Sequence, residues 1–308
     1  MPGADVLVIV GPTAVGKSQV GLHLAQILTG EIVSADSMQV YKLMDIGTAK
    51  PTPEEQKLVR HHLIDVVYPW EKFSVARYQE LADRAIQDIL HRGRTPIVVG
   101  GTGLYVTALL DGFLFPDKGH TKTRRRLEKV AQTSPQRLYQ RLQEVDPEAA
   151  AKIHPQNLRR VIRALEVYYD TKKPISLHQR EAQRKTPRYQ ALFFGLTMPR
   201  DLLYERINRR VDGMMAAGLL EEARRLMEYG PSVTSMQALG YKELWRYLRG
   251  ECSLEEAVEL LKRDTRRYAK RQYTWFRRDE RIRWIDLVAV GGLEGAVSLI
   301  AEAWENRG

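Results

Sequence analysis

The chain has 308 residues, of which 44% are hydrophobic and 28% charged, and its formal net charge is +10. Such a chain holds one large domain with an insertion, or two domains, and can bury a sizeable core. It contains no apolar run near the roughly 18 residues of a membrane span, and residues 1–5 do not resemble a secretory signal. We therefore expect a cytoplasmic protein with no membrane partner, whose single cysteine, Cys252, is an incidental thiol.

Strand and helix patterns alternate through the first hundred residues. Residues 6–10 form a β-branched and leucine run that ends in glycine, which is typical of a buried parallel strand. A helix is predicted at 17–28, a strand at 31–35, a weaker strand at 63–67, a helix from the N-cap Ser74 to about 92, and a strand at 95–99. This alternation predicts an α/β fold with a doubly wound parallel sheet.

A phosphate-binding motif lies between the first strand and the first helix. Residues 11–18 match G-x-x-x-x-G-K-[ST] at every fixed position. Glycines let the backbone N–H groups turn toward a phosphate, Lys17 adds a charge, and Ser18 places a hydroxyl for Mg²⁺. The motif predicts a P-loop NTPase-like core without indicating which molecule carries the phosphates. The residues expected to hold them are Gly11, Thr13, Ala14, Val15, Gly16, Lys17 and Ser18.

Two more loops are expected at the same edge of the sheet, because ligands of open parallel sheets bind outside the carboxyl ends of the strands. Residues 36–41 follow the second strand, and residues 100–105 follow the strand at 95–99. Three roles are open for Asp36: a base, a carboxylate that organises a metal, or a loop cap. Thr102, between two glycines, either contacts a phosphate or belongs to a tight turn.

The pattern changes from residue 114 to 189, which read as helical and basic. Helices are predicted at 123–130, 134–144, 147–152 and 156–169. A strand at 193–198 then returns to the sheet, followed by helices at 201–215, 240–248 and 253–276, a strand at 282–286 and a helix at 293–304. We expect a catalytic core from residues 1–113 and 190–308, and a helical insertion domain from 114–189.

The positive charge is clustered, which favours a polyanionic partner. One group gathers in the insertion and a second lies in the predicted helix 253–276 and just after it, where aromatic residues are interleaved with it. The first group is Lys122, Arg124, Arg125 and Arg126; the second is Arg263, Arg266, Arg267, Lys270, Arg271, Arg277 and Arg278, with Tyr268, Tyr273, Trp275 and Phe276.

From near residue 6 to near residue 278, the ordered set of motifs resembles the tRNA dimethylallyltransferase (tRNA isopentenyltransferase) family of bacterial type. The segments that carry the resemblance are 11–18, 35–41, 46–51, 61–65, 100–105, 153–155, 159–166, 239–243 and 265–276. The chain departs from the family at Gln156 and Asn157, where Asn-Asp is frequent, so these two residues receive no role.

The resemblance implies the ligand and the reaction. The loop would hold dimethylallyl diphosphate with Mg²⁺, and the acceptor would be N6 of the adenosine immediately 3′ of the anticodon, adenosine 37 of tRNA. Asp36 would be the general base, acting with Lys17 and Thr102 as the catalytic set. The helical insertion would contact the anticodon stem-loop, and we expect a monomer. The residues implied to contact tRNA are Asp36, Ser37, Met38, Gln39, Thr102, Arg124, Arg159, Arg160, Arg163 and Lys242.

Two other classes of protein share the phosphate loop. A P-loop small-molecule kinase is the stronger alternative, although the chain lacks the H-R-D and D-F-G signatures of protein kinases. The second is a non-enzymatic RNA-binding protein on a degenerate NTPase fold, which the intact Lys17, Ser18 and Asp36 disfavour.

Overall fold

The structure is a computed structural model that describes residues 5–111, 121–183, 187–232 and 234–307. The chain divides into two compact units, one of Met1–Leu109 with Tyr189–Gly308 and one of Leu110–Arg188. The predicted first residue of the insertion, 114, lies outside the described residues.

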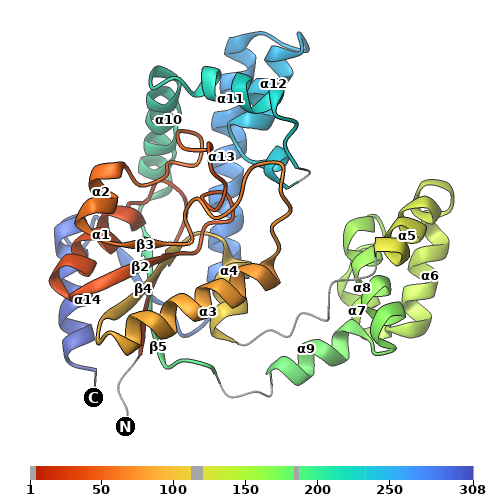
Figure 1. Ribbon diagram of the computed structural model, residues 1–308, viewed down its shortest axis with the longest axis horizontal. Helices are drawn as coiled ribbons and strands as arrows, with labels where there is room; N and C mark the ends of the chain where they lie inside the picture. The colour runs from red at the N-terminus through yellow and green to blue at the C-terminus, as the bar shows by residue number, and fades with distance from the viewer. Residues whose placement is uncertain (1–4, 112–120, 184–186, 233, 308) are drawn as a thin grey trace. The chain divides into compact units, whose positions relative to one another are not determined.

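A parallel sheet of six strands, in the order β3-β2-β4-β1-β5-β6, organises the first unit (Figure 1). The predicted doubly wound α/β fold is therefore confirmed, and five strands lie within a few residues of their predicted positions. These strands are β1 (Val6–Val10), β2 (Gly30–Ser34), β4 (Thr95–Gly100), β5 (Ala191–Thr197) and β6 (Arg283–Asp286).

The third strand corrects the sequence prediction. β3 is His61–His62, the pair that precedes the predicted strand at 63–67, and it pairs in parallel with β2. Leu63 and Asp65 have φ angles of 65° and 56°, in the left-handed region, which a strand cannot accommodate. Val67 forms only an isolated bridge to Tyr41. The predicted strand at 63–67 is therefore wrong.

Helices surround this sheet, and none of the helices in the described part of the chain is long and apolar enough to cross a membrane. The Ser74 side chain accepts a hydrogen bond from the Arg77 N–H at 3.2 Å, as its predicted N-cap role requires. The helices are α1 (Lys17–Ile27), α2 (Pro53–Leu58), α3 (Val75–His91), α4 (Gly103–Leu110), α10 (Arg200–Ala216), α11 (Leu219–Glu228), the 3₁₀ helix η1 (Ser235–Gln237), α12 (Tyr241–Leu248), α13 (Leu254–Phe276) and α14 (Leu293–Glu305).

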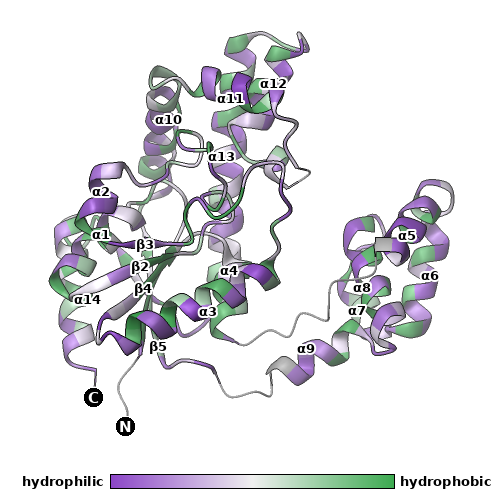
Figure 2. Cartoon of the chain, in the orientation of Figure 1, coloured by the Kyte–Doolittle hydropathy of each residue, from purple (hydrophilic) through white to green (hydrophobic). Residues whose placement is uncertain are grey.

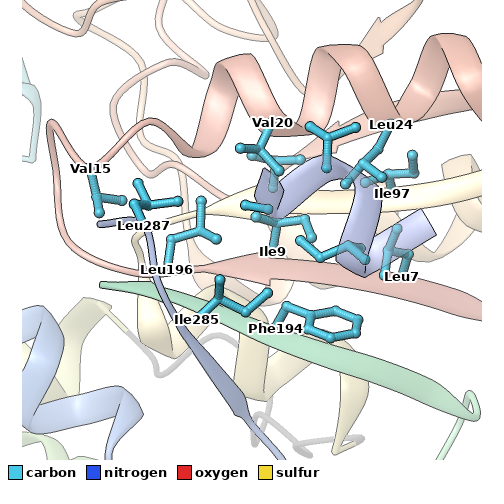
Figure 3. Packing of buried hydrophobic residues seen from close by; sticks show 14 of the residues in the cluster. Leu7, Ile9, Val15, Val20, Leu24, Ile97, Phe194, Leu196, Ile285 and Leu287 are labelled. Carbon is cyan, nitrogen blue, oxygen red and sulfur yellow. The ribbon is translucent and has the colours of Figure 1, made fainter. Parts of the chain in front are cut away.

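Alternate residues of the strands form the main core against α1 and α14 (Figure 3). Leu7 and Ile9 of β1 are fully buried there, with Val20 and Leu24 of α1 packed over them. Each such side chain contributes about 1.5–3 kcal/mol through burial. Helix α3 also packs on β2 and β4 and buries Tyr78. In Figure 2 the central strands are largely hydrophobic, whereas hydrophilic residues alternate along the helices. This core holds the strands in place, and with them the loops that leave the carboxyl edge of the sheet.

The second unit is helical and has its own core. Leu138, Leu142, Val161 and Leu165 are buried together in it. The Asp146 carboxylate accepts hydrogen bonds from the N–H groups of Ala149 and Ser176, both at 3.0 Å, and so joins two of its helices. Its helices are α5 (Thr121–Thr133), α6 (Pro135–Val145), α7 (Pro147–Lys152), α8 (Leu158–Thr171) and α9 (Ile175–Gln183), the last of which the sequence did not predict.

Candidate active site

The phosphate loop joins β1 to α1 in a curled conformation. Gly11 and Gly16 have φ angles of 143° and 113°, and Ala14 lies at 64°. A Cβ atom on Gly11 would be 2.6 Å from the carbonyl oxygen of Leu196 in β5, so that position also needs glycine for space. Gly16 is the N-cap of α1, so the partial positive charge at the N-terminus of this helix lies at the end of the loop, where a phosphate would bind.

Two cations meet at this loop. The Lys17 ammonium donates a hydrogen bond to the Pro12 carbonyl at 2.6 Å. Burial and the positive charge of Arg210 together lower the pKa of Lys17 to about 7, and the charge of Asp36 partly opposes them. Burial also lowers the pKa of Arg210, again with Asp36 opposing. Two neighbouring, partly buried cations, one of which lowers the pKa of the other, form a site for an anion.

Asp36 lies directly after β2, at the edge where ligands are expected. Its Oδ1 atom accepts hydrogen bonds from the N–H groups of Met38 at 2.8 Å and Gln39 at 3.3 Å. The carboxylate therefore caps its own loop, which is one of the three roles that the sequence left open for Asp36. Oδ2 accepts no hydrogen bond from any residue that the structure describes, which leaves that oxygen for other chemistry.

The loop after β4 is bonded to the loop after β2. The Ser37 N–H donates to Thr102 Oγ1 at 3.0 Å, and the Thr102 N–H donates to the Ala35 carbonyl at 3.1 Å. A Cβ atom on Gly100 would lie 2.3 Å from that carbonyl oxygen. Glycine at this position lets the loops approach closely, and Thr102 holds Ser37 in place.

Gln39 was implied to contact tRNA, and in this structure its side-chain amide forms hydrogen bonds within the protein. Its Oε1 accepts a hydrogen bond from Ser34 Oγ at 2.9 Å, and its Nε2 donates to the carbonyls of Thr48 at 3.3 Å and Ala49 at 3.1 Å. Both ends of the amide are therefore used. In this structure Gln39 positions the segment at 48–49, and it lines the pocket together with the neighbouring Met38.

The segment at 45–48 is held from the other side by a buried carboxylate. Glu222 of α11 accepts hydrogen bonds from the N–H groups of Asp45, Ile46 and Gly47, each at 3.0 Å, and from the Tyr241 hydroxyl at 2.6 Å. Four donors on one carboxylate fix this segment against the helices. Gly47 and Thr48 consequently form a defined part of the pocket wall.

Gln272 of α13, which the sequence analysis did not single out, joins two of the three loops. Its Oε1 accepts a hydrogen bond from the Thr13 N–H at 2.8 Å, and its Nε2 donates to the Gly101 carbonyl at 2.9 Å. Only 5% of its surface is exposed. One buried amide thus sets the position of the phosphate loop relative to the loop after β4.

These loops and the helices α10 and α13 enclose a pocket of about 280 Å³, all of it within the first unit. Four cationic side chains line it, Lys17, Arg210, Lys242 and Arg271, against a single carboxylate, Asp36. An apolar wall also lines it, made of Ile207, Val211 and Met214 of α10 and Leu261 of α13. The pocket can therefore take a molecule that is anionic at one end and apolar at the other.

Tyr268 of α13 lines the pocket. Burial raises its pKa well above the usual value, the charge of Asp36 adds to the effect, and the neighbouring Thr102 and Gln272 side chains oppose it. The helical spacing offered a signal for it and for Gln272, because residues 261, 265, 268 and 272 share one face of α13. Likewise, Arg210 is a charged residue within the apolar stripe of α10.

Lys242, predicted to contact tRNA, lies at the first turn of α12. Its ammonium is 3.1 Å from Glu243 Oε1 and 3.4 Å from Asp264 Oδ2. About a third of its side chain, 36%, is exposed, so it lines the pocket with part of its charge already balanced.

The other predicted tRNA contacts belong to the second unit. Arg124 of α5 and Arg163 of α8 both reach the buried carboxylate of Glu166, at 3.4 Å and 2.9 Å. Arg159 and Arg160 are exposed at the start of α8. The first pair therefore stabilises the unit with part of its charge, whereas the second pair is open to a partner.

A divalent metal was predicted at Ser18. In the described part of the chain, no group of three or more His, Cys, Asp or Glu side chains forms a metal site. The donors present are the exposed Ser18 hydroxyl and Asp36 Oδ2, both on the pocket lining. Hard oxygen donors of this kind suit Mg²⁺, which commonly takes most of its ligands from water and from substrate phosphates. The residues fit a metal that arrives with a diphosphate.

Comparison with known proteins gives a consistent result. Residues 39–279 match the family model described as IPP transferase. The chain is 54% identical to tRNA dimethylallyltransferase of Acetivibrio thermocellus, over 92% of this chain and 91% of the relative, and 54% identical to that of Carboxydothermus hydrogenoformans, over 91% of each.

Two solved structures extend the likeness to the fold. The tRNA isopentenylpyrophosphate transferase of Bacillus halodurans is 47% identical, with a TM-score of 0.71 over 98% of both chains. A eukaryotic dimethylallyltransferase acting on tRNA is 33% identical, with a TM-score of 0.85 over 98% of this chain and 80% of that one.

Proposed function

This chain belongs to the IPP transferase family, and we propose that it transfers the dimethylallyl group of dimethylallyl diphosphate to N6 of adenosine 37 in tRNA. The products are N6-isopentenyladenosine and diphosphate. The chain is a tRNA prenyltransferase, and the relatives do not favour the small-molecule kinase alternative. The observation that carries the proposal is the pocket, in which paired cations face an apolar wall.

The diphosphate end of the substrate belongs in the phosphate loop. Backbone N–H groups of residues 11–18 and the charges of Lys17 and Arg210 would bind it. An anion beside Lys17 offsets both burial and the charge of Arg210, so binding restores the protonated ammonium. We propose Ser18 as the protein ligand of Mg²⁺, which when bound helps to neutralise the leaving diphosphate.

The prenyl end belongs against the apolar wall. Ile207, Val211 and Met214 of α10 and Leu261 of α13 offer aliphatic surface and a thioether on the side of the pocket lined by these helices. Excluding water there protects an allylic carbon with cationic character from hydrolysis. The wall also orients C1 for attack from the side opposite the departing oxygen, which is the contribution of positioning.

The acceptor amine is a weak nucleophile, because its lone pair is delocalised into the purine ring. We propose that N6 attacks C1 of the prenyl group while the C1–O bond breaks and its electron pair leaves with the diphosphate. Asp36 Oδ2 then takes the proton from N6, since Oδ1 is held by two backbone N–H groups. Ser37, Met38 and Thr102 would contact the flipped base.

The tRNA would be held on a wider surface. We propose that the helical insertion grips the anticodon stem-loop through Arg124, Arg159, Arg160 and Arg163, with Lys242 nearer the reacting base. Residues 1–113 and 190–308 would form the catalytic core, and 114–189 the insertion. We also propose that the protein acts as a monomer in the cytoplasm.

The direct test incubates the protein with Mg²⁺, radiolabelled dimethylallyl diphosphate and an unmodified anticodon stem-loop, with ATP in a parallel reaction. Label should enter the RNA only when adenosine 37 is present, and an adenosine-to-guanosine substitution there is the matched control. Rapid ATP turnover without prenyl transfer would overturn the proposal in favour of a kinase.

A further inference from the structure

An exposed row of aromatic side chains lies on the first unit, outside the pocket lining. The row consists of Tyr68, Trp70 and Tyr229 and is called the aromatic row below. Tyr68 and Trp70 stack with centroids 4.7 Å apart and planes 8° apart, and Tyr229 follows 5.7 Å from Trp70 at 51°. Their exposures are 39%, 43% and 55%, respectively. Neighbouring rings that stay this exposed are typical of an interaction site.

A cation closes one end of the row. The Lys42 ammonium lies 4.6 Å from the centroid of the Tyr68 ring. Since Trp70 stacks on one face of Tyr68, Lys42 occupies the other face, and Tyr229 is the outermost ring at the opposite end. The ammonium forms no ion pair with any residue that the structure describes, so its charge is available to an anionic partner.

Backbone hydrogen bonds tie the row to two segments that line the pocket. The Lys42 N–H donates to the Val67 carbonyl at 2.8 Å, and Lys42 follows Gln39 by at most about 11 Å of chain. The Ser232 N–H and the Ser235 hydroxyl donate to the Pro69 carbonyl at 2.7 Å and 2.6 Å, and the pocket lining begins two residues after Ser235, at Gln237. Hydrogen bonds thus join the segments of the row to stretches of chain that lead into the pocket lining.

We propose that the aromatic row is a stacking platform for an unpaired base of the tRNA anticodon loop, beside the adenosine that enters the pocket. This inference rests on the proposed function. Flipping one base out of a loop leaves its neighbours unstacked, and exposed rings replace the lost stacking without demanding a particular base. Lys42 supplies a contact to a phosphate of the same strand. The net charge of +10 favours RNA over another protein as the partner.

Substitution of the outermost ring tests the platform with little risk to folding. Binding of an anticodon stem-loop oligonucleotide would be measured by fluorescence anisotropy for the intact chain and for Tyr229→Leu, Tyr229→Phe and Trp70→Leu. Both leucine variants keep apolar volume but lose the ring, so their Kd should rise roughly 5- to 10-fold. Tyr229→Phe keeps the ring and should bind like the original chain.

Two controls separate stacking from other effects. Leu299→Ala removes an equally exposed apolar side chain (40% exposed) on α14 and should leave the Kd unchanged. Lys42→Ala should flatten the slope of log affinity against log salt by about 0.7, the value for one single-strand phosphate contact, whereas Tyr229→Leu should not. In addition, 2-aminopurine in the loop beside adenosine 37 should be quenched on binding by the intact chain but not by Tyr229→Leu.

The outcomes distinguish this inference from the proposed function. If the intact chain prenylates the stem-loop and the leucine variants bind it normally, the platform is refuted and the reaction stands. If the variants lose affinity but the intact chain transfers no prenyl group, the platform stands and the reaction is refuted. A change in sedimentation of the free variants, with unchanged RNA binding, would assign the row to self-association and overturn the proposal.

Discussion

Gln272 offers the sharpest test of how the pocket is assembled, because one buried amide bonds two loops that come from distant parts of the chain. Gln272→Glu keeps the shape of the side chain and the acceptor for the Thr13 N–H. It removes the donor to the Gly101 carbonyl, which the native amide reaches at 2.9 Å, and places a carboxylate oxygen against that carbonyl.

The expected magnitude follows from that geometry. A buried acceptor left without its donor costs about 1–3 kcal/mol, and repulsion between the two oxygens moves the loops apart. Because a misplacement of about 1 Å can lower a rate by roughly 100-fold, we expect kcat/KM for dimethylallyl diphosphate to fall by about that factor. The Kd for the stem-loop should stay within about 3-fold, since Gln272 is only 5% exposed and does not face solvent.

Single-turnover prenyl transfer is the appropriate assay, because slow product release hides a defect in the chemical step. Gln237→Glu is the matched control: it adds the same charge to a glutamine of the pocket lining without removing a bond between loops. A single-turnover rate and KM for Gln272→Glu equal to those of the native chain would refute the positioning role. Equal losses in both variants would assign the effect to charge alone.

Four further outcomes are expected. Asp36→Asn can still accept the two backbone hydrogen bonds but cannot take a proton, so single-turnover transfer should fall by about 100-fold or more with folding intact. A near-native rate would show that Asp36 only caps its loop. The pKa of Lys17 is lowered to about 7, so its ammonium loses its proton as the pH rises through that value, whereas an arginine stays charged. Calorimetry should therefore show that the diphosphate affinity of the native chain, divided by that of Lys17→Arg, declines between pH 6 and 8. Glu222→Leu leaves four donors without an acceptor and should lower the free energy of unfolding by about 3 kcal/mol or more, and the melting temperature by roughly 5–10 °C. An unchanged melting curve would contradict the anchoring role. Reversing the charges of Arg159 and Arg160 together should weaken stem-loop binding and flatten its salt dependence, while transfer at saturating RNA stays normal.

Much of the fold could be predicted from the sequence because its signals are local. A run of buried β-branched residues at 6–10 indicates a strand wherever it lies in the sheet, and β1 spans those residues. The phosphate loop was equally predictable, since Gly11 and Gly16 are needed for backbone angles that few other residues adopt. The family resemblance then indicated the substrate class, which the loop by itself does not.

The prediction failed where a local pattern was overridden by a turn. Residues 63–67 are rich in aliphatic side chains and read as a strand, yet Leu63 and Asp65 adopt positive φ angles. The Lys50 ammonium forms an ion pair with Asp65 and donates a hydrogen bond to the Tyr41 carbonyl at 2.9 Å. Contacts of this kind between separate loops favour a backbone conformation that intrinsic propensity disfavours.

The sequence by itself determined most of the order of strands and helices along the chain, the phosphate loop, and the residue types available for chemistry. Only the tertiary structure decided which side chains meet. It brought Arg210 of α10 to Lys17, placed Gln272 of α13 between Thr13 and Gly101, and bonded the Gln39 amide to Ser34 and Ala49. The physical reason is that hydrogen bonds and charge interactions act over a few ångströms in space, whereas sequence patterns report only neighbours along the chain.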